Sequence, residues 1–241
     1  MNKKYTYVWV SLIVLIFGII VVPRIVDRLQ SGTIVDMDRM NIVPQEKGLS
    51  YVLLNEVKRK VPSFQFINQD SLLISDKDYI GKVYVVEFFF TSCPSICPIM
   101  TENLVELQNH FKDQPDFGVA SFSITPDYDT PKVLKQYAEK YSITDIDWHL
   151  LTGNKEAVYD LANSGFNIFA AEMPDSPGGF EHSGLFALVD RQGYIRCRLD
   201  KFGNPIVYYR GAITREMGKN DHGEEEQISV LQEDIQKLLQ E

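Results

Sequence analysis

The strongest constraint on the fold is an apolar run that leads directly into a pair of cysteines. From Gly81 to Phe90 nearly every residue is β-branched or aromatic, and Cys93 and Cys97 follow shortly afterwards. Such a run without polar alternation is typical of a strand that is buried on both faces, as in the centre of an α/β sheet. We therefore predict a core strand here and an α/β fold around it.

The residues after this strand predict a helix that carries both cysteines at its start. Apolar residues recur at helical spacing between Pro98 and Phe111. At this junction Cys93 and Cys97, four residues apart, can share one face. Exposed amide N–H groups and the helix dipole are expected to favour thiolate over thiol, and both metal binding and disulfide exchange require the thiolate. The pattern predicts a metal or redox site, and soft sulfur ligands suit Cu(I).

Predicted strands and helices alternate along the rest of the chain. The strands are expected at residues 61–68 with 71–74, 82–90, 118–124, 148–151, 184–190 and 194–199, and the helices at 98–111, 130–141, 155–165 and 226–240. Thr130 or Asp129 before Pro131 makes a good helix start. This alternation predicts a mixed sheet with helices on both faces.

Several motifs in one order give the chain a resemblance to the Sco/SenC family of copper-binding, thioredoxin-like cytochrome oxidase assembly proteins. The resemblance runs from about Val61 to Arg210 and includes C-P-x-x-C-P after an F-F-T strand end, a D-T-P turn, L-L-T-G, and a His-Ser pair before a strand. It implies a thioredoxin-like fold and a copper ion held by Cys93, Cys97 and His182. Without the resemblance, a single loop histidine would be a weak ligand candidate.

Three positions near these motifs depart from the family pattern. The family commonly has Asp between the cysteines, where this chain has Ser95, and Asp before the histidine, where it has Glu181. It also usually reads D-P where this chain has Thr125 and Pro126. These changes remove or lengthen an acidic group and can alter copper affinity, redox behaviour or partner choice. All three implied ligands are retained.

Two functions from different classes remain open. The resemblance implies a copper metallochaperone, with no catalytic residue, that passes copper to the binuclear site of cytochrome c oxidase subunit II; such a site should be exposed. The alternative is an enzyme, a thiol–disulfide oxidoreductase that uses Cys93 and Cys97 as a redox pair to reduce the target's copper-ligand cysteines. The Cys-x-x-x-Cys spacing is wider than the usual Cys-x-x-Cys, and simple exchange would not need His182. Either role allows a further partner, a copper donor or a thiol reductant.

Thiol peroxidase is a third reading, and the residues before the cysteines argue against it. Peroxidases of this fold carry a Thr three residues before the reactive Cys. This chain has Phe90 there, and Thr91 lies one residue too close.

The N-terminal residues predict a membrane anchor. Residues 5–22 are uncharged and would span about 27 Å as a helix. Without a small-x-small cleavage site, a retained signal anchor over 1–23 is expected, followed by a tether over 24–60 and the copper-binding domain over 61–241. Lys3 and Lys4 favour a cytoplasmic N-terminus, although Arg24 and Arg28 weaken the signal. With the resemblance, this predicts a single-pass protein of the bacterial inner membrane whose domain lies on the periplasmic, outer side.

Charge and the remaining cysteine and histidine residues limit other functions. The formal net charge of −9 disfavours nucleic acid and anionic lipid as partners. Cys197 is expected to be a buried strand residue, with the two neighbouring arginines on the opposite side. His110 and His149 are expected to be structural, and His222 to be a solvated histidine in a polar surface insertion rather than an auxiliary ligand.

Overall fold

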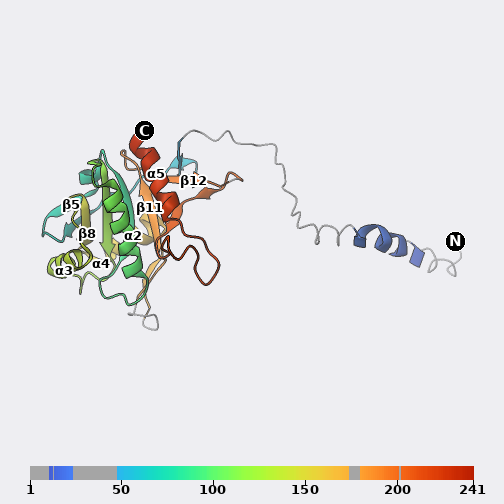
Figure 1. The fold of residues 1–241 in the computed structure, drawn as a ribbon, viewed down its shortest axis with the longest axis horizontal. Helices are drawn as coiled ribbons and strands as arrows, with labels where there is room; N and C mark the ends of the chain where they lie inside the picture. The colour runs from blue at the N-terminus through green and yellow to red at the C-terminus, as the bar shows by residue number, and fades with distance from the viewer. Residues whose placement is uncertain (1–10, 13, 24–47, 174–179, 201) are drawn as a thin grey trace. The chain divides into compact units, whose positions relative to one another are not determined.

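The computed structural model describes residues 11–12, 14–23, 48–173, 180–200 and 202–241, which belong to two compact units, 1–44 and 45–241 (Figure 1). In the first unit, residues 11–12 and 14–23 are helical and expose large apolar side chains such as Phe17 and Ile19. The rest of the predicted anchor, and residues 24–47 of the predicted tether, lie outside the described residues. Within the described residues, the length and apolar character that a bilayer crossing demands are not met by any helix.

The second unit is built on one large mixed sheet. Its centre is formed by three parallel strands, β6 (Val83–Phe89), β7 (Phe117–Ser123) and β8 (Trp148–Thr152). Strand β11 (Leu185–Val189) lies antiparallel to β6 on its other side. The order across the sheet is β1-β12-β11-β6-β7-β8-β4-β5, with β13 beside β12 and β14 beside β11.

The other elements complete this sheet or cover it. The remaining strands are β1 (Ser50–Tyr51), β2 (Leu53–Leu54), β3 (Val57–Lys58), β4 (Gln65–Asn68), β5 (Leu73–Ser75), β9 (Ala170–Glu172), β10 (Phe180–His182), β12 (Ile195–Leu199), β13 (Pro205–Ile206) and β14 (Tyr208–Arg210). The helices are α2 (Ile96–Phe111), α3 (Pro131–Tyr141), α4 (Lys155–Asp160), which continues into a wider helical turn (Leu161–Phe166), and α5 (Ile228–Gln240), with a 3-10 turn at Asp76–Tyr79.

Helices cover both faces of the central strands. Phe89 packs against Tyr137 of α3 with ring centres 5.5 Å apart, whereas Phe88 packs against Phe166 of the helical turn after α4 at 5.9 Å. Successive strand residues point to opposite faces, so α3 and this turn lie on opposite sides of the sheet. Every residue of β6 and β7 is buried. The predicted core strand and the mixed sheet with helices on both faces are confirmed.

Two boundaries differ from the sequence-based expectation. Residues 48–60, assigned to the tether, are part of the folded unit, because β1 pairs with β12 and Leu49 and Val52 are buried. Helix α2 begins at Ile96, two residues before the predicted start, so Cys97 lies inside its first turn. Pro98, the third residue of α2, has no amide hydrogen to donate. This does not disturb the helix, because the first amide groups of a helix have no intrahelical acceptor.

The C-terminal helix covers the arginine side of β12. Cys197 is fully buried, as predicted, and burial raises the pKa of its thiol to about 11. On the opposite side Arg198 forms a forked ion pair with Asp234 of α5, and the Tyr209 hydroxyl donates to the same carboxylate at 2.9 Å. Asp234 is fully buried. The α5 helix is therefore held by a buried charge as well as by apolar contacts.

We predict that Asp234→Ala lowers the free energy of unfolding by about 3 kcal/mol, because it leaves Arg198 and the Tyr209 hydroxyl without their shared partner. Glu233→Ala is the matched control, since Glu233 binds the same arginine from an exposed position, and its loss should cost less than about 1 kcal/mol. Urea unfolding of residues 45–241 checks both values. Equal losses in the two variants would contradict the assignment of α5 anchoring to Asp234.

Candidate functional site

The two cysteines lie on the connection between β6 and α2. The amide of Cys93 donates to the carbonyl of Phe90 at 3.2 Å, which closes a tight turn immediately after the strand. Cys97 is the second residue of α2, and the two cysteine side chains share a hydrogen bond. They are not joined by a disulfide. The structure therefore brings both thiols together, as predicted.

Burial of the thiols contradicts two expectations about this site. Cys93 is 8% exposed and Cys97 only 1%, so the predicted exposed site is wrong for this conformation. Burial raises the pKa of Cys97 far above its ordinary value, the hydrogen bond with Cys93 adds to this, and a backbone hydrogen bond with Phe90 acts in the opposite direction. The helix N-terminus does not keep Cys97 as a thiolate because desolvation of a charge in the interior outweighs it.

A buried carboxyl group lies on the same side of β6 as α2 and α3. Glu87 accepts a hydrogen bond from Ser121 at 2.6 Å, and Ser121 in turn accepts one from the Trp148 indole at 3.0 Å. The Glu87 Oε2 atom is buried without a hydrogen-bond partner among the described residues. Burial raises the pKa of Glu87 to about 7, and its charge contributes to the raised pKa of Cys97. The only signal in the sequence was one acidic residue inside an apolar strand.

The backbone of His182 is brought to this connection by β10. His182 pairs with Ala170 of β9. The residues at the two ends of the β10 segment, Phe180 and Gly184, contact residues next to the cysteines. The Phe180 ring lies 5.5 Å from the Phe90 ring, and Gly184 lies so close to Ile96 that a side-chain carbon there would stand 3.2 Å from the Ile96 methyl group. Gly184 also has φ +64, which favours glycine. The His182 side chain falls outside what the structure describes, so its ligation stays a prediction.

The other titratable candidates do not join the cysteines. His149 contacts Asn68 at 3.2 Å, and the His110 ring packs edge-on against Phe111. His222 is exposed in a turn, and its amide donates to Asn220. No group of three His, Cys, Asp or Glu side chains suited to a metal occurs within the described part of the chain, which includes Cys93 and Cys97 but not the His182 side chain.

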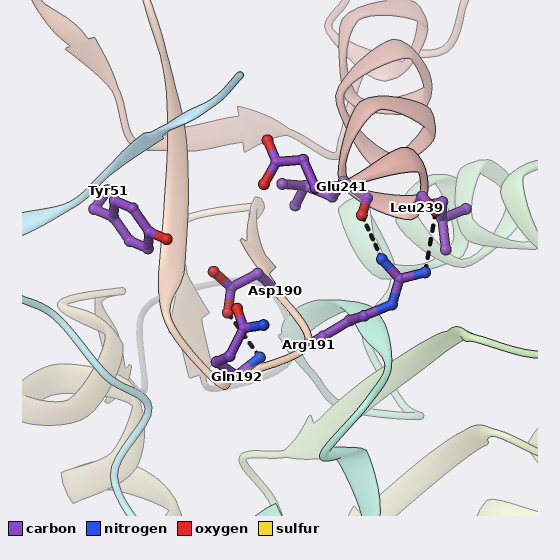
Figure 2. Close-up of a pocket in the computed structure, with 7 residues that line it drawn as sticks. Tyr51, Asp190, Arg191, Gln192, Leu239 and Glu241 are labelled. Atoms are coloured by element: carbon purple, nitrogen blue, oxygen red, sulfur yellow. Dashed lines mark hydrogen bonds between the residues drawn. The ribbon is translucent and has the colours of Figure 1, made fainter. Parts of the chain in front are cut away.

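A pocket of about 510 Å³ lies at the opposite end of the sheet (Figure 2). Its lining consists of Tyr51, Asp190, Arg191, Gln192, Leu238, Leu239 and Glu241. Asp190 follows the end of β11 that pairs with Tyr84 at the start of β6, whereas the cysteines follow the other end of β6. Arg191 donates to the carbonyls of Leu238 and Leu239 across the pocket. These contacts fasten the end of α5 and do not involve the cysteine site.

The fold and the cysteine connection agree with a comparison against protein families, in which residues 54–215 match the SCO1/SenC family. The chain belongs to the SCO1/SenC family. The match covers every strand of the large sheet except β1, and also both cysteines and β10, so the thioredoxin-like Sco fold is shown together with the family.

Individual relatives support the same conclusion. A SCO1 homologue of Bacillus subtilis is 33% identical over 138 residues, which cover 56% of this chain and 71% of that protein. A Stutzerimonas stutzeri protein described as a candidate copper-binding protein is 30% identical over 166 residues, covering 66% of this chain and 76% of that one. The solved structure of BsSco, described as a Sco family cytochrome c oxidase assembly protein with a disulfide switch, has a TM-score of 0.60 at 26% identity and covers 80% of this chain and 96% of its own.

The raised pKa of Glu87 predicts a pH dependence of stability. The unfolded chain releases this proton near its ordinary pKa of 4.5, whereas the folded protein retains it up to about pH 7. Between these values the folded state binds more protons, so Glu87 lowers the free energy of unfolding as pH rises, by at most about 1.4 kcal/mol per pH unit. Glu87→Gln removes this loss, and its stability relative to the original chain should increase from pH 5 to pH 7 and then level off.

Urea unfolding of both proteins at four pH values between 5 and 8 measures this difference. Other titrating groups are common to the two proteins and cancel. Glu233→Gln, an exposed substitution, is the control and should show a difference that does not change with pH. A pH-independent difference for Glu87→Gln would show that this carboxyl group titrates normally.

Proposed function

We propose that this protein is a copper metallochaperone that binds one copper ion through Cys93, Cys97 and His182 and helps assemble the binuclear copper site of cytochrome c oxidase subunit II. The observation that carries the proposal is the pair of hydrogen-bonded thiols at the strand–helix junction, with β10 attached beside them. Two sulfur donors and one imidazole suit Cu(I). The described copper-binding and oxidase-assembly relatives support the same assignment.

The chemistry of loading follows from the burial of the thiols. Metal binding requires thiolates, so the raised pKa of Cys97 means that copper must displace a proton from this sulfur. The two thiolates then more than neutralise the single positive charge of Cu(I), so the loaded sulfur pair is anionic. Transfer to a client proceeds by exchange of ligands and needs neither a general acid nor a substrate pocket. Since both thiols are buried, the turn that carries Cys93 must change conformation to expose them when copper binds and when it is released.

A thiol–disulfide reductase is the second candidate, favoured by the hydrogen bond between the two thiols. In that reaction Cys93 and Cys97 lose two electrons and two protons as their disulfide forms, and a disulfide of the target takes them up as it becomes two thiols. The disulfide switch described for BsSco supports such a couple. Burial and the raised pKa of Cys97 oppose rapid attack, because the thiolate is the nucleophile.

We further propose that the N-terminal apolar residues anchor the chain in the bacterial inner membrane, with the folded unit on the periplasmic side. The described part of this segment is helical and exposes apolar side chains. Subunit II of the oxidase would then be reached across the outer face of that membrane, which is the side that the chaperone role requires.

We predict one copper per chain, lost in Cys93→Ser and in Cys97→Ser and weakened in His182→Ala. Losing a thiolate removes a strong bond and a compensating charge, whereas losing the imidazole leaves two sulfurs that still hold Cu(I). Elemental analysis after anaerobic reconstitution with Cu(I) and desalting measures the copper content. Cys197→Ala is the control and should retain one copper, because Cys197 lies in β12 away from this connection. Equal copper in the original chain and the Cys93/Cys97 double mutant would exclude the chaperone proposal.

We predict that a cysteine placed at position 146 is labelled by a membrane-impermeant thiol reagent in intact spheroplasts. Ile146 is 86% exposed, whereas the native thiols are buried and would report poorly. Ile146→Cys should react before lysis, and the chain without this substitution gives the background. Asn2→Cys is the matched control and should react only after lysis. The reverse pattern would overturn the proposed orientation and, with it, the oxidase client.

A further inference from the structure

A single buried carboxylate gathers four hydrogen bonds next to the cysteine turn. Asp129, in the loop between β7 and α3, is fully buried. It accepts from the Thr91 amide at 3.1 Å and from the Thr91 hydroxyl, from the Ser123 hydroxyl at 2.6 Å, and from the Thr125 hydroxyl at 2.9 Å. Three of these bonds end on Oδ2 and one on Oδ1, so both oxygens of the Asp129 carboxylate accept hydrogen bonds.

Thr91 is the residue through which this carboxylate reaches the cysteines. It lies inside the tight turn that the Cys93 amide closes onto the Phe90 carbonyl. Both of its donors, the amide and the hydroxyl, go to Asp129. The backbone of Phe90, at the other end of the turn, makes a hydrogen bond with the Cys97 thiol. A turn fixed at Thr91 therefore determines where Cys93 stands relative to Cys97.

We propose that Asp129 is a positioning residue that, through Thr91, fixes the separation of the Cys93 and Cys97 sulfur atoms. The effect of Asp129 on Cu(I) affinity rests on the proposed copper function, whereas its effect on the equilibrium between dithiol and disulfide does not. Sulfur separation matters for both reactions, because a disulfide needs Cα atoms about 4.4–6.8 Å apart and a metal needs both sulfurs at bonding distance. Asp129 would thus set how readily the pair closes into a disulfide and how tightly it holds a metal.

The competing interpretation is that Asp129 only joins β7 and α3 to the rest of the fold. The two interpretations differ in what Thr91 and Ser123 should do. Ser123 donates to the same carboxylate from the core strand β7, whereas Thr91 donates to it from within the cysteine turn. Removing the Ser123 hydroxyl should lower stability alone, whereas removing the Thr91 hydroxyl should also change the chemistry of the cysteines.

The experiment compares the full chain with Thr91→Val, Thr91→Ser, Ser123→Ala and Asp129→Asn, each purified in mild detergent. The first readout is the equilibrium constant between dithiol and disulfide for Cys93 and Cys97, measured without copper against the two-electron couple of dithiothreitol and its cyclic disulfide. The second is the affinity for Cu(I), measured by competition with a chromophoric chelator. Thermal unfolding gives the stability of each variant.

We expect Thr91→Val and Asp129→Asn to change the equilibrium constant and the Cu(I) affinity by about tenfold. Thr91→Ser keeps both donors and should restore values within about threefold of the original chain. Ser123→Ala should also stay within this range, although it loses stability as Thr91→Val does. If Asp129→Asn does not fold, the comparison of Thr91→Val with Ser123→Ala still distinguishes the positioning role of Asp129 from a purely structural role.

The outcomes separate this proposal from the proposed function. If the original chain binds no Cu(I) but Thr91→Val shifts the thiol equilibrium, the positioning role stands and the copper function falls. If the chain binds Cu(I) and Thr91→Val changes neither readout, the positioning role is overturned and the copper function stands. Equal shifts in Thr91→Val and Ser123→Ala would also overturn it, because a general loss of stability would then explain both.

Discussion

Burial of β6 on both faces is the constraint on which the site depends. Every residue of this strand is buried, and in the connection that follows Cys93 and Cys97 are buried while Ser92, Pro94 and Ser95 are exposed. The thiols are therefore placed by the end of the core strand and by a short connection whose other residues are exposed or half-buried. The same burial disfavours charge, so the metal-free pair is held protonated at Cys97. Burial next to the core strand therefore determines both where the thiols lie and why Cys97 keeps its proton.

The departures from the family pattern acquire a physical meaning in this environment. The hydroxyl of Ser95 lies 3.6 Å from the Cys93 sulfur, where a carboxylate would have placed a negative charge beside a developing thiolate. Thr125 donates to Asp129, whereas a second carboxylate at this position would have repelled it. Both changes reduce the negative charge around the cysteine turn, and the Thr125 hydroxyl supplies a hydrogen bond that an ionised Asp cannot donate.

Local patterns predicted the parts of the structure that local physics determines. The apolar run gave β6, and the Thr130-Pro131 start of α3 is present, with the Thr130 hydroxyl accepting from the Val133 amide. Residues 48–60 were assigned to the tether because such short strands have no periodicity of their own and are defined by their partner strands. The buried state of the thiols, the Glu87 environment and the Asp129 contacts were also not predicted. Each depends on residues far apart in the chain meeting in the core, which spacing does not encode.

Two buried acidic groups, the Cys97 thiol and the Glu87 carboxyl, couple the binding of a cation at the site to the loss of protons. Burial raises the pKa of both Cys97 and Glu87 because it penalises their charged forms, and once Glu87 is ionised its charge raises the pKa of Cys97 further. A cation entering beside the sulfurs would favour both ionised forms at once, since an opposite charge lowers the pKa of nearby acids. Copper binding by the thiols would then be coupled to proton release, and protonation would favour release of the ion. Under the proposed chaperone function, delivery of the ion would leave a pair of thiols that the core again stabilises in the neutral state, which opposes return of the ion.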